Sequence, residues 1–112
     1  MDQDNADVMD KACQFLLVLK EQGINIMAAY LFGSYAKGNP HKWSDIDIAI
    51  VSPDFSSSRF DNSLRLMKIA SKIDLSIEPV AYHPESFVDE DPLVWEIKKD
   101  GIPLEIEHGI NR

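Results

Sequence analysis

The 112-residue sequence is poor in cysteine, in basic residues and in long hydrophobic runs. A single cysteine, Cys13, excludes an intramolecular disulfide. Eleven basic residues against 19 acidic ones give a net charge of −8, which argues against stable binding to nucleic acid. The apolar runs are too short to span a bilayer, and the first residues are acidic where a signal peptide is basic. We therefore expect a cytoplasmic protein without membrane binding, for which a basic protein partner is easier to accommodate than nucleic acid.

What is present suits one small globular domain. Hydrophobic residues make up 45% of the chain and charged residues 27%, which is ordinary for a folded protein. A chain of this length buries roughly two-thirds of its unfolded surface, enough for a single core. We therefore expect one domain over residues 1–112, with little material for a second lobe.

Hydrophobic periodicity predicts an α/β (α+β) domain with a small mixed sheet. The first helix has an apolar stripe on which we place Cys13 as a packed core residue. In the third strand Pro79 cannot donate to a ladder, so we expect it at a sheet edge or a bulge. The predicted helices are 5–22, 59–72 and 91–100, and the predicted strands are 26–32, 45–52, 73–82 and a short one at 102–106.

Gly33 and Gly38 are separated by four residues, the glycine spacing of a P-loop. Asn39 and Pro40 stand where a P-loop needs lysine and a hydroxyl residue, so we reject that motif. Gly33 and Ser34 remain candidates for binding phosphate, because they follow a buried strand and open a predicted helical turn with unpaired N–H groups. Lys37 adds a nearby positive charge.

Two carboxylates follow on the next predicted strand. Asp45 and Asp47 lie two residues apart, so their side chains leave the same face, with Cα atoms about 6.5 Å apart. Two aspartates on one face repel each other, and a divalent cation removes that cost. A solvated strand face remains the alternative interpretation.

A third carboxylate is expected from the neighbouring strand, where Asp74 and Glu78 are both candidates. We favour Glu78, because it stands in the middle of the apolar run 73–82, where a carboxylate is unfavourable unless it has a function. Asp74 lies near the start of that run and could instead mark the exit from the preceding helix.

Together these residues resemble the DNA polymerase β-like nucleotidyltransferases. Gly33 and Ser34, ten residues, Asp45, one residue and Asp47 form the G-S-x10-D-x-D signature of that family, and the flanking strands agree with it. The short length is similar to the minimal nucleotidyltransferase branch, whose members are often antitoxins encoded beside HEPN-domain toxins. The signature covers residues 31–52, and the order of elements extends the resemblance over most of the chain.

The resemblance implies a nucleotidyltransferase fold with helices packed mainly on one face of the sheet. It implies that Asp45, Asp47 and Glu78 hold two Mg²⁺ ions and act in catalysis, with Glu78 accepting a proton. Gly33, Ser34 and Lys37 would bind the phosphates of ATP. The implied reaction is transfer of AMP to a tyrosine of the HEPN toxin, in a hetero-oligomer where the partner supplies part of the site.

Two departures leave alternatives open. The third acid is glutamate where many relatives have aspartate, and Pro79 follows it directly. A catalytically weak or inactive antitoxin that acts by binding alone is therefore the second hypothesis. Transfer to a small molecule is the third, although the chain leaves little room for a second substrate domain.

Overall fold

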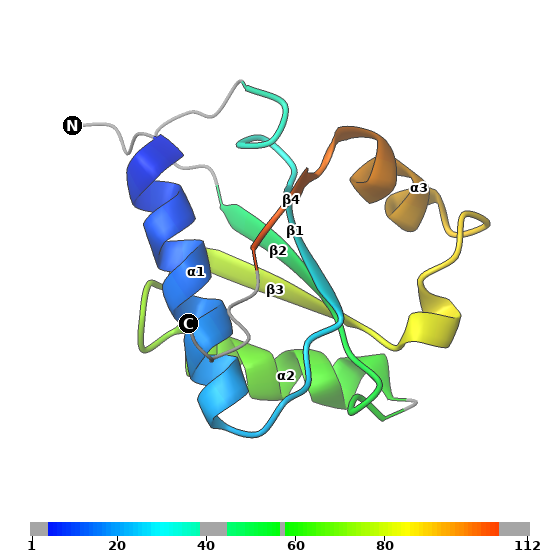
Figure 1. The fold of residues 1–112 in the computed structure, drawn as a ribbon, viewed down its shortest axis with the longest axis horizontal. Coiled ribbons are helices and arrows are strands. Elements are labelled where there is room, and N and C mark those ends of the chain that lie inside the picture. Colours follow the sequence, from blue (N-terminus) through cyan, green and yellow to red (C-terminus); the bar gives the residue numbers. More distant parts are fainter. Residues whose placement is uncertain (1–4, 39–44, 57, 106–112) are drawn as a thin grey trace.

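The computed structural model describes residues 5–38, 45–56 and 58–105. Over these residues the chain forms three α-helices, four strands and one short 3₁₀ helix (Figure 1). No helix among the described residues is long and apolar enough to cross a membrane. In chain order the elements are α1 (Asn5–Glu21), β1 (Ala28–Phe32), β2 (Ile46–Val51), α2 (Arg59–Ala70), β3 (Ile77–Tyr82), η1 (Pro84–Ser86), α3 (Pro92–Asp100) and β4 (Ile102–Pro103).

The strands form one mixed sheet in the order β3-β2-β1-β4. β2 and β3 are parallel and are joined by α2, whereas β1 is antiparallel to both of its neighbours. The carbonyls of Ser76 and Tyr82 accept hydrogen bonds from the amides of Ile46 and Ser52. The backbone N–H and C=O groups of even-numbered residues in β3 therefore point toward β2. The backbone of Pro79 points to the open edge of the sheet, so its lack of an N–H removes no hydrogen bond between strands. The predicted edge position of Pro79 is confirmed.

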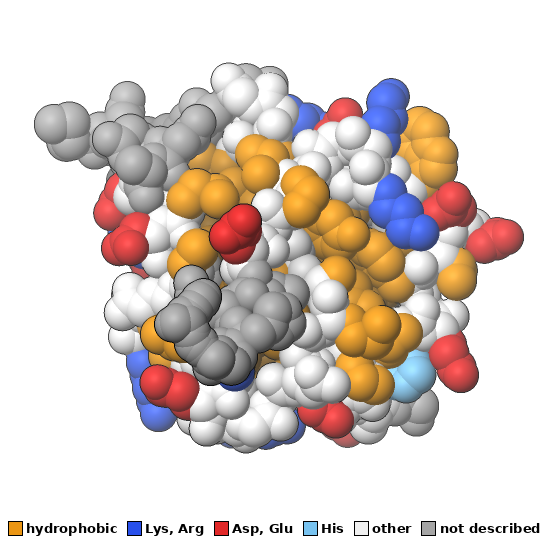
Figure 2. All heavy atoms as spheres, viewed as in Figure 1, with side chains coloured by type: hydrophobic (Ala, Val, Ile, Leu, Met, Phe, Trp, Pro, Cys, Tyr) orange, Lys and Arg blue, Asp and Glu red, His pale blue; other side chains and the backbone are white. Residues whose placement is uncertain are grey.

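Helices cover the two faces of the sheet unequally, as predicted. α1 and α2 pack on one face, against the buried isoleucines Ile46, Ile48 and Ile50 of β2. α3 packs on the opposite face, where Val94 and Ile97 contact a smaller cluster with Ala49 and Val51. Figure 2 shows hydrophobic side chains reaching the surface between the sheet and α3. The α3 face is therefore the less completely covered one.

The prediction for Cys13 is wrong, because its side chain is exposed. The buried stripe of α1 runs through Val8, Ala12, Phe15 and Leu19. At 3.6 residues per turn, Cys13 lies about 120° around the helix from the centre of that stripe. The buried stripe includes Phe15, and it is therefore centred on a different side of α1 from the stripe that the periodicity predicted.

The third strand is shorter than predicted. β3 begins at Ile77, and residues 73–76 form turns instead. Asp74 stabilises this irregular segment, because its carboxylate accepts a hydrogen bond from the Ser76 amide (2.7 Å) and pairs with Lys11 of α1. α3 begins as predicted, with Asp91 as N-cap and Pro92 at the first position. The last strand is confined to two residues, and Ile106 lies outside the described residues.

Candidate active site

Asp45, Asp47 and Glu78 come together at the beginning of the two parallel strands. Asp47 is the second residue of β2 and Glu78 the second residue of β3, and the register pairs them directly. Adjacent strands lie about 4.8 Å apart and paired residues share a face, so these side chains are neighbours. Asp45 directly precedes β2. One carboxylate oxygen from each residue lies within 4.8 Å of the other two.

Asp74, the alternative third acid, does not join this group. Its turn places it before β3, where it is bound to Lys11 and to the Ser76 amide. Burial acts to raise the pKa of Asp74, but the hydrogen bonds from Lys11 and Ser76 outweigh it and lower that pKa overall. Asp74 is thus a structural carboxylate that ties α1 to the start of β3, and Glu78 is the acid that the fold brings to the pair.

The three carboxylates create an unfavourable concentration of negative charge. Partial burial, together with the charges of Glu78 and Asp45, raises the pKa of Asp47 to about 6. A cation that neutralises the group would remove both the repulsion and the cost of desolvation. Carboxylate oxygens gathered at this spacing suit a hard divalent ion such as Mg²⁺. The residues present therefore fit the metal that the family resemblance implies.

Gly33 lies directly against this group. It ends β1 with φ at +77°, a conformation that favours glycine, and the preceding Phe32 pairs with Asp47 across the sheet. A Cβ at position 33 would lie 3.1 Å from the Asp47 Cγ and would overlap the Oδ2 oxygen. The backbone of the glycine turn thus lies against the Asp47 carboxylate, with no room for a side chain between them. A ligand bound to this turn would also be in reach of the acids.

The turn after Gly33 has the helical character expected for an anion site. The Lys37 amide donates to the Gly33 carbonyl (3.1 Å), an i to i+4 bond that closes one turn. The first N–H groups of such a turn have no acceptor within it and attract anions. Ser34 is half-buried at the start of this turn, next to Gly33. The site therefore combines a group of three carboxylates, whose spacing suits a cation, with a turn whose geometry suits an anion.

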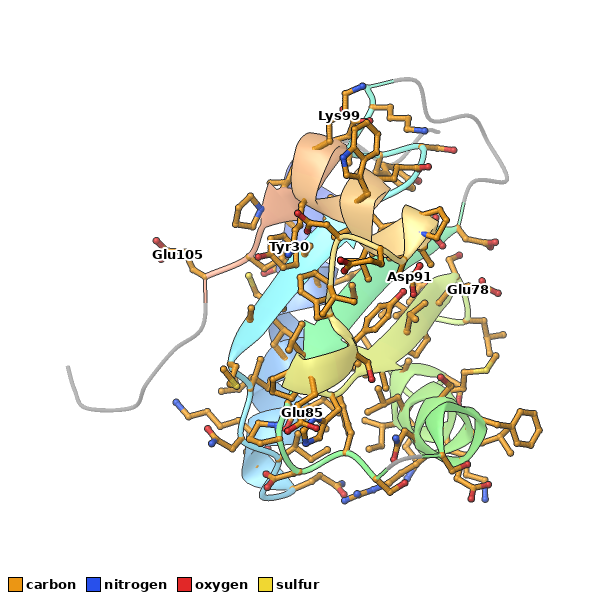
Figure 3. All side chains as sticks on the ribbon, turned by 90° about the vertical axis from the view of Figure 1, so that its right-hand side faces the viewer. Tyr30, Glu78, Glu85, Asp91, Lys99 and Glu105 are labelled. Carbon is orange, nitrogen blue, oxygen red and sulfur yellow. The ribbon has the colours of Figure 1, made fainter. Side chains whose placement is uncertain are left out.

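Lys37 has a partner that the sequence did not predict. Its Nζ lies 3.1 Å from Glu96 Oε2 of α3, and both side chains are roughly half exposed. The ion pair connects the glycine turn to the helix on the same face of the sheet as Asp47 and Glu78 (Figure 3 labels Glu78 below α3). No spacing in the sequence indicated Glu96, because the contact depends on how α3 packs on the sheet.

Comparison with known proteins agrees with this geometry. A family model described as the nucleotidyltransferase domain matches residues 12–104. The chain is 33% identical over 78 residues to the protein adenylyltransferase MntA of Shewanella oneidensis. The aligned region covers 67% of this chain and 53% of that protein. The chain thus spans about half the length of this curated relative.

Solved structures share the fold. A structure from Sulfolobus solfataricus assigned as a nucleotidyltransferase superposes with a TM-score of 0.63 at 21% identity, covering 91% of this chain and 83% of that one. The structure of a toxin–antitoxin with AMP-PNP superposes with a TM-score of 0.58 at 24% identity, covering 89% and 74% of the two chains. At these identities the likeness establishes the fold alone.

Proposed function

Because the chain belongs to the nucleotidyltransferase domain family, we propose that it transfers AMP from ATP to a tyrosine hydroxyl of a partner HEPN-domain toxin and so acts as the antitoxin. The observation that carries this proposal is the contact between the Gly33 turn and Asp47, within a group of three carboxylates. A triphosphate bound to the turn would have its reacting phosphorus beside the acids. The proposal also draws on the activity named for the adenylyltransferase MntA and on the structural neighbour with AMP-PNP.

The residues have distinct roles in the proposed reaction. Gly33 and Ser34 bind the β- and γ-phosphates through backbone N–H groups and the Ser34 hydroxyl, and Lys37 offsets phosphate charge. Asp45, Asp47 and Glu78 would hold two Mg²⁺ ions, which when bound supply charge stabilisation for the attacking and leaving oxygens. The chain therefore positions the triphosphate from two sides.

The bond changes balance without a further reactant. The tyrosine oxygen forms a bond to the α-phosphorus while the bond from that phosphorus to the bridging oxygen breaks, and pyrophosphate leaves. Glu78 accepts the phenolic proton, since its side chain is exposed and it belongs to the edge strand β3, where an acceptor from a partner can approach. The partner supplies the tyrosine.

The test is to incubate the purified chain with Mg²⁺, ATP and the protein encoded by the adjacent gene, and to measure intact masses. We expect the partner to gain the mass of AMP, and Asp45→Asn or Asp47→Asn to abolish that gain. Asp100→Asn, an exposed aspartate at the end of α3, is the matched control and should remain active. A stable complex that silences the partner without any gain of mass would instead support an antitoxin that acts by binding alone.

A further inference from the structure

The outward face of α2 carries large hydrophobic side chains that no described part of the chain covers. Phe60, Leu64 and Met67 are 72%, 45% and 46% exposed. They stand at positions i, i+4 and i+7, so they form one row along the helix. Leu75, in the turn that follows α2, is 86% exposed. Single exposed hydrophobic residues are normal, but a continuous row on one helix marks an interaction surface.

A row of positive charges runs beside the hydrophobic one. Arg65, Lys68 and Lys72 are exposed, and within the described residues none of them has an ion-pair partner. At 100° per residue Arg65 and Lys68 lie on average about 100° around the helix from the apolar row, on the side away from the core, and Lys72 follows in the turn after Ala70. We call the two rows together the α2 docking face.

The charge of this segment is opposite to that of the rest of the chain. Residues 59–72 contain four basic residues and one acid, a net charge of +3, so the remainder carries −11. Segregation of this kind favours a partner whose contacting surface is acidic. This expectation differs from the basic partner that the net charge of the whole chain favoured. The local charge of the contacting surface determines which partner surface is complementary, and the net charge of the chain does not.

We infer that the α2 docking face binds the partner protein itself, through an apolar groove bordered by aspartate and glutamate. This inference rests on the proposed function and names the surface by which the protein substrate is held. A helix that places residues i, i+4 and i+7 in an apolar groove is a common mode of protein recognition. The rim cations pair with acids of the partner and fix the register along the groove.

The position of the face suits this role. α2 packs against β3, the edge strand that carries Glu78. In Figure 3, α2 (green, lower right) and the labelled Glu78 both lie toward the right-hand edge of the view, although α2 covers the face of the sheet opposite the Glu78 side chain. α2 ends at Ala70 and only the turn 71–76 separates it from β3. A partner held on α2 would therefore have to pass around the edge strand β3 to reach the acids on the other face of the sheet.

Other occupants fit the charges less well. A two-fold contact between the α2 faces of two copies would bring the cations together. Nucleic acid and anionic membranes would be repelled by the net charge of −8, and nucleic acid makes no favourable contact with an exposed apolar row. An acidic, grooved protein surface satisfies both rows at once.

The experiment compares two face variants with two matched controls. Phe60→Ser with Met67→Ser removes the apolar row, and Lys68→Glu with Lys72→Glu reverses the charge. Met27→Ser, at a methionine 57% exposed in the segment before β1, and Lys99→Glu on α3 are the controls. Binding of the adjacent gene's product is measured by calorimetry, and transfer of AMP to it by kinetics, after circular dichroism has shown that each variant is folded.

We expect each face variant to weaken binding at least about tenfold and to raise KM for the partner, with kcat and ATP binding unchanged. The controls should stay within about twofold. Unchanged affinity in folded face variants would overturn the inference, as would a wild-type chain that does not bind this partner. The inference is equally wrong if the face mediates self-association, RNA binding or binding to anionic vesicles in place of the partner.

The two proposals fail separately. If the face variants lose binding but the wild-type chain transfers no AMP, the docking face stands and the enzymatic function is wrong. If transfer proceeds with the same KM in wild type and face variants, the enzymatic function stands and the docking face is wrong.

Discussion

Gly33 is the residue at which backbone geometry and site chemistry meet, and a second glycine provides its control. Gly33 and Gly38 both have positive φ, +77° and +79°, but only at Gly33 would a Cβ meet Asp47. Among the described residues a Cβ at Gly38 meets no atom within 4 Å. Gly38→Ala should therefore lower the unfolding free energy by about 1 kcal/mol, the cost of the left-handed conformation for alanine. Gly33→Ala should have the same cost in unfolding free energy and should also displace the Asp47 carboxylate. Binding of Mg²⁺·ATP should therefore weaken at least about tenfold. Calorimetry and urea unfolding of both variants check this, and equal nucleotide affinities would contradict it.

Asp47 makes the stability of the metal-free protein depend on pH. Its pKa of about 6 in the folded chain exceeds the ordinary value of 3.8, so the native state holds the proton more tightly than the unfolded state does. The stabilisation is complete below pH 3.8 and is lost as pH rises through about 6. Asn resembles the protonated form. Asp47→Asn should be more stable than wild type above pH 6 by about 1 kcal/mol, after allowance for solvent screening of a half-buried group.

Urea unfolding from pH 3 to 8 measures this difference, which should vanish at the acid end, below the ordinary pKa of 3.8. Saturating Mg²⁺ is the internal control, because the metal needs the ionised carboxylate and should make the wild type the more stable protein at pH 7. If wild type and Asp47→Asn differed in unfolding free energy by the same amount at every pH, the Asp47 pKa would not be raised in the folded chain.

At the scale of elements, the ion pair between the glycine turn and α3 competes with the nucleotide. Lys37 cannot contact both Glu96 and a phosphate at full strength. Exposed ion pairs contribute at most about 1 kcal/mol, so Glu96→Gln should tighten Mg²⁺·ATP binding by about two- to fourfold. Asp89→Asn breaks a similar pair with Lys98 and should leave ATP affinity unchanged. Calorimetric titration separates the two variants, and an equal gain in both would indicate a general charge effect.

The strands and helices also show which features of the fold the sequence pattern could predict. The alternation of isoleucine with aspartate and alanine in β2 predicted the strand and the face that packs on α1 and α2, because a period of two is decided within the strand. Ala49 and Val51 on the other face are buried as well, because α3 covers them. Pro79 predicted its edge position for another local reason, which is that proline has no N–H to donate to a neighbouring strand. The end of β3 near Asp74 was missed, since a salt bridge to Lys11, 63 residues away, and an Asp–Ser turn hold that segment out of the sheet. Glu96 escaped prediction similarly, because its contact with Lys37 depends on tertiary packing.

For the whole molecule, the excess of acidic charge complicates any test of metal binding. A chain with net charge −8 gains stability from every salt through screening, so a rise in Tm with MgCl₂ does not by itself show a site. A specific site adds to that effect by mass action, about 2.7 kcal/mol at one hundred times Kd. For a domain of this size that corresponds to a further rise in Tm of roughly 10 °C.

The measurement is thermal unfolding in MgCl₂ and in NaCl of the same ionic strength. Wild type should show the additional rise in MgCl₂, and Asp45→Asn, which removes one of the three converging oxygens, should show only the part common to both salts. Asp100→Asn removes the same charge from the end of α3 and should behave as wild type. Equal curves for wild type in the two salts would mean that the three carboxylates, although gathered by the fold, act on the metal only as part of a diffuse negative surface.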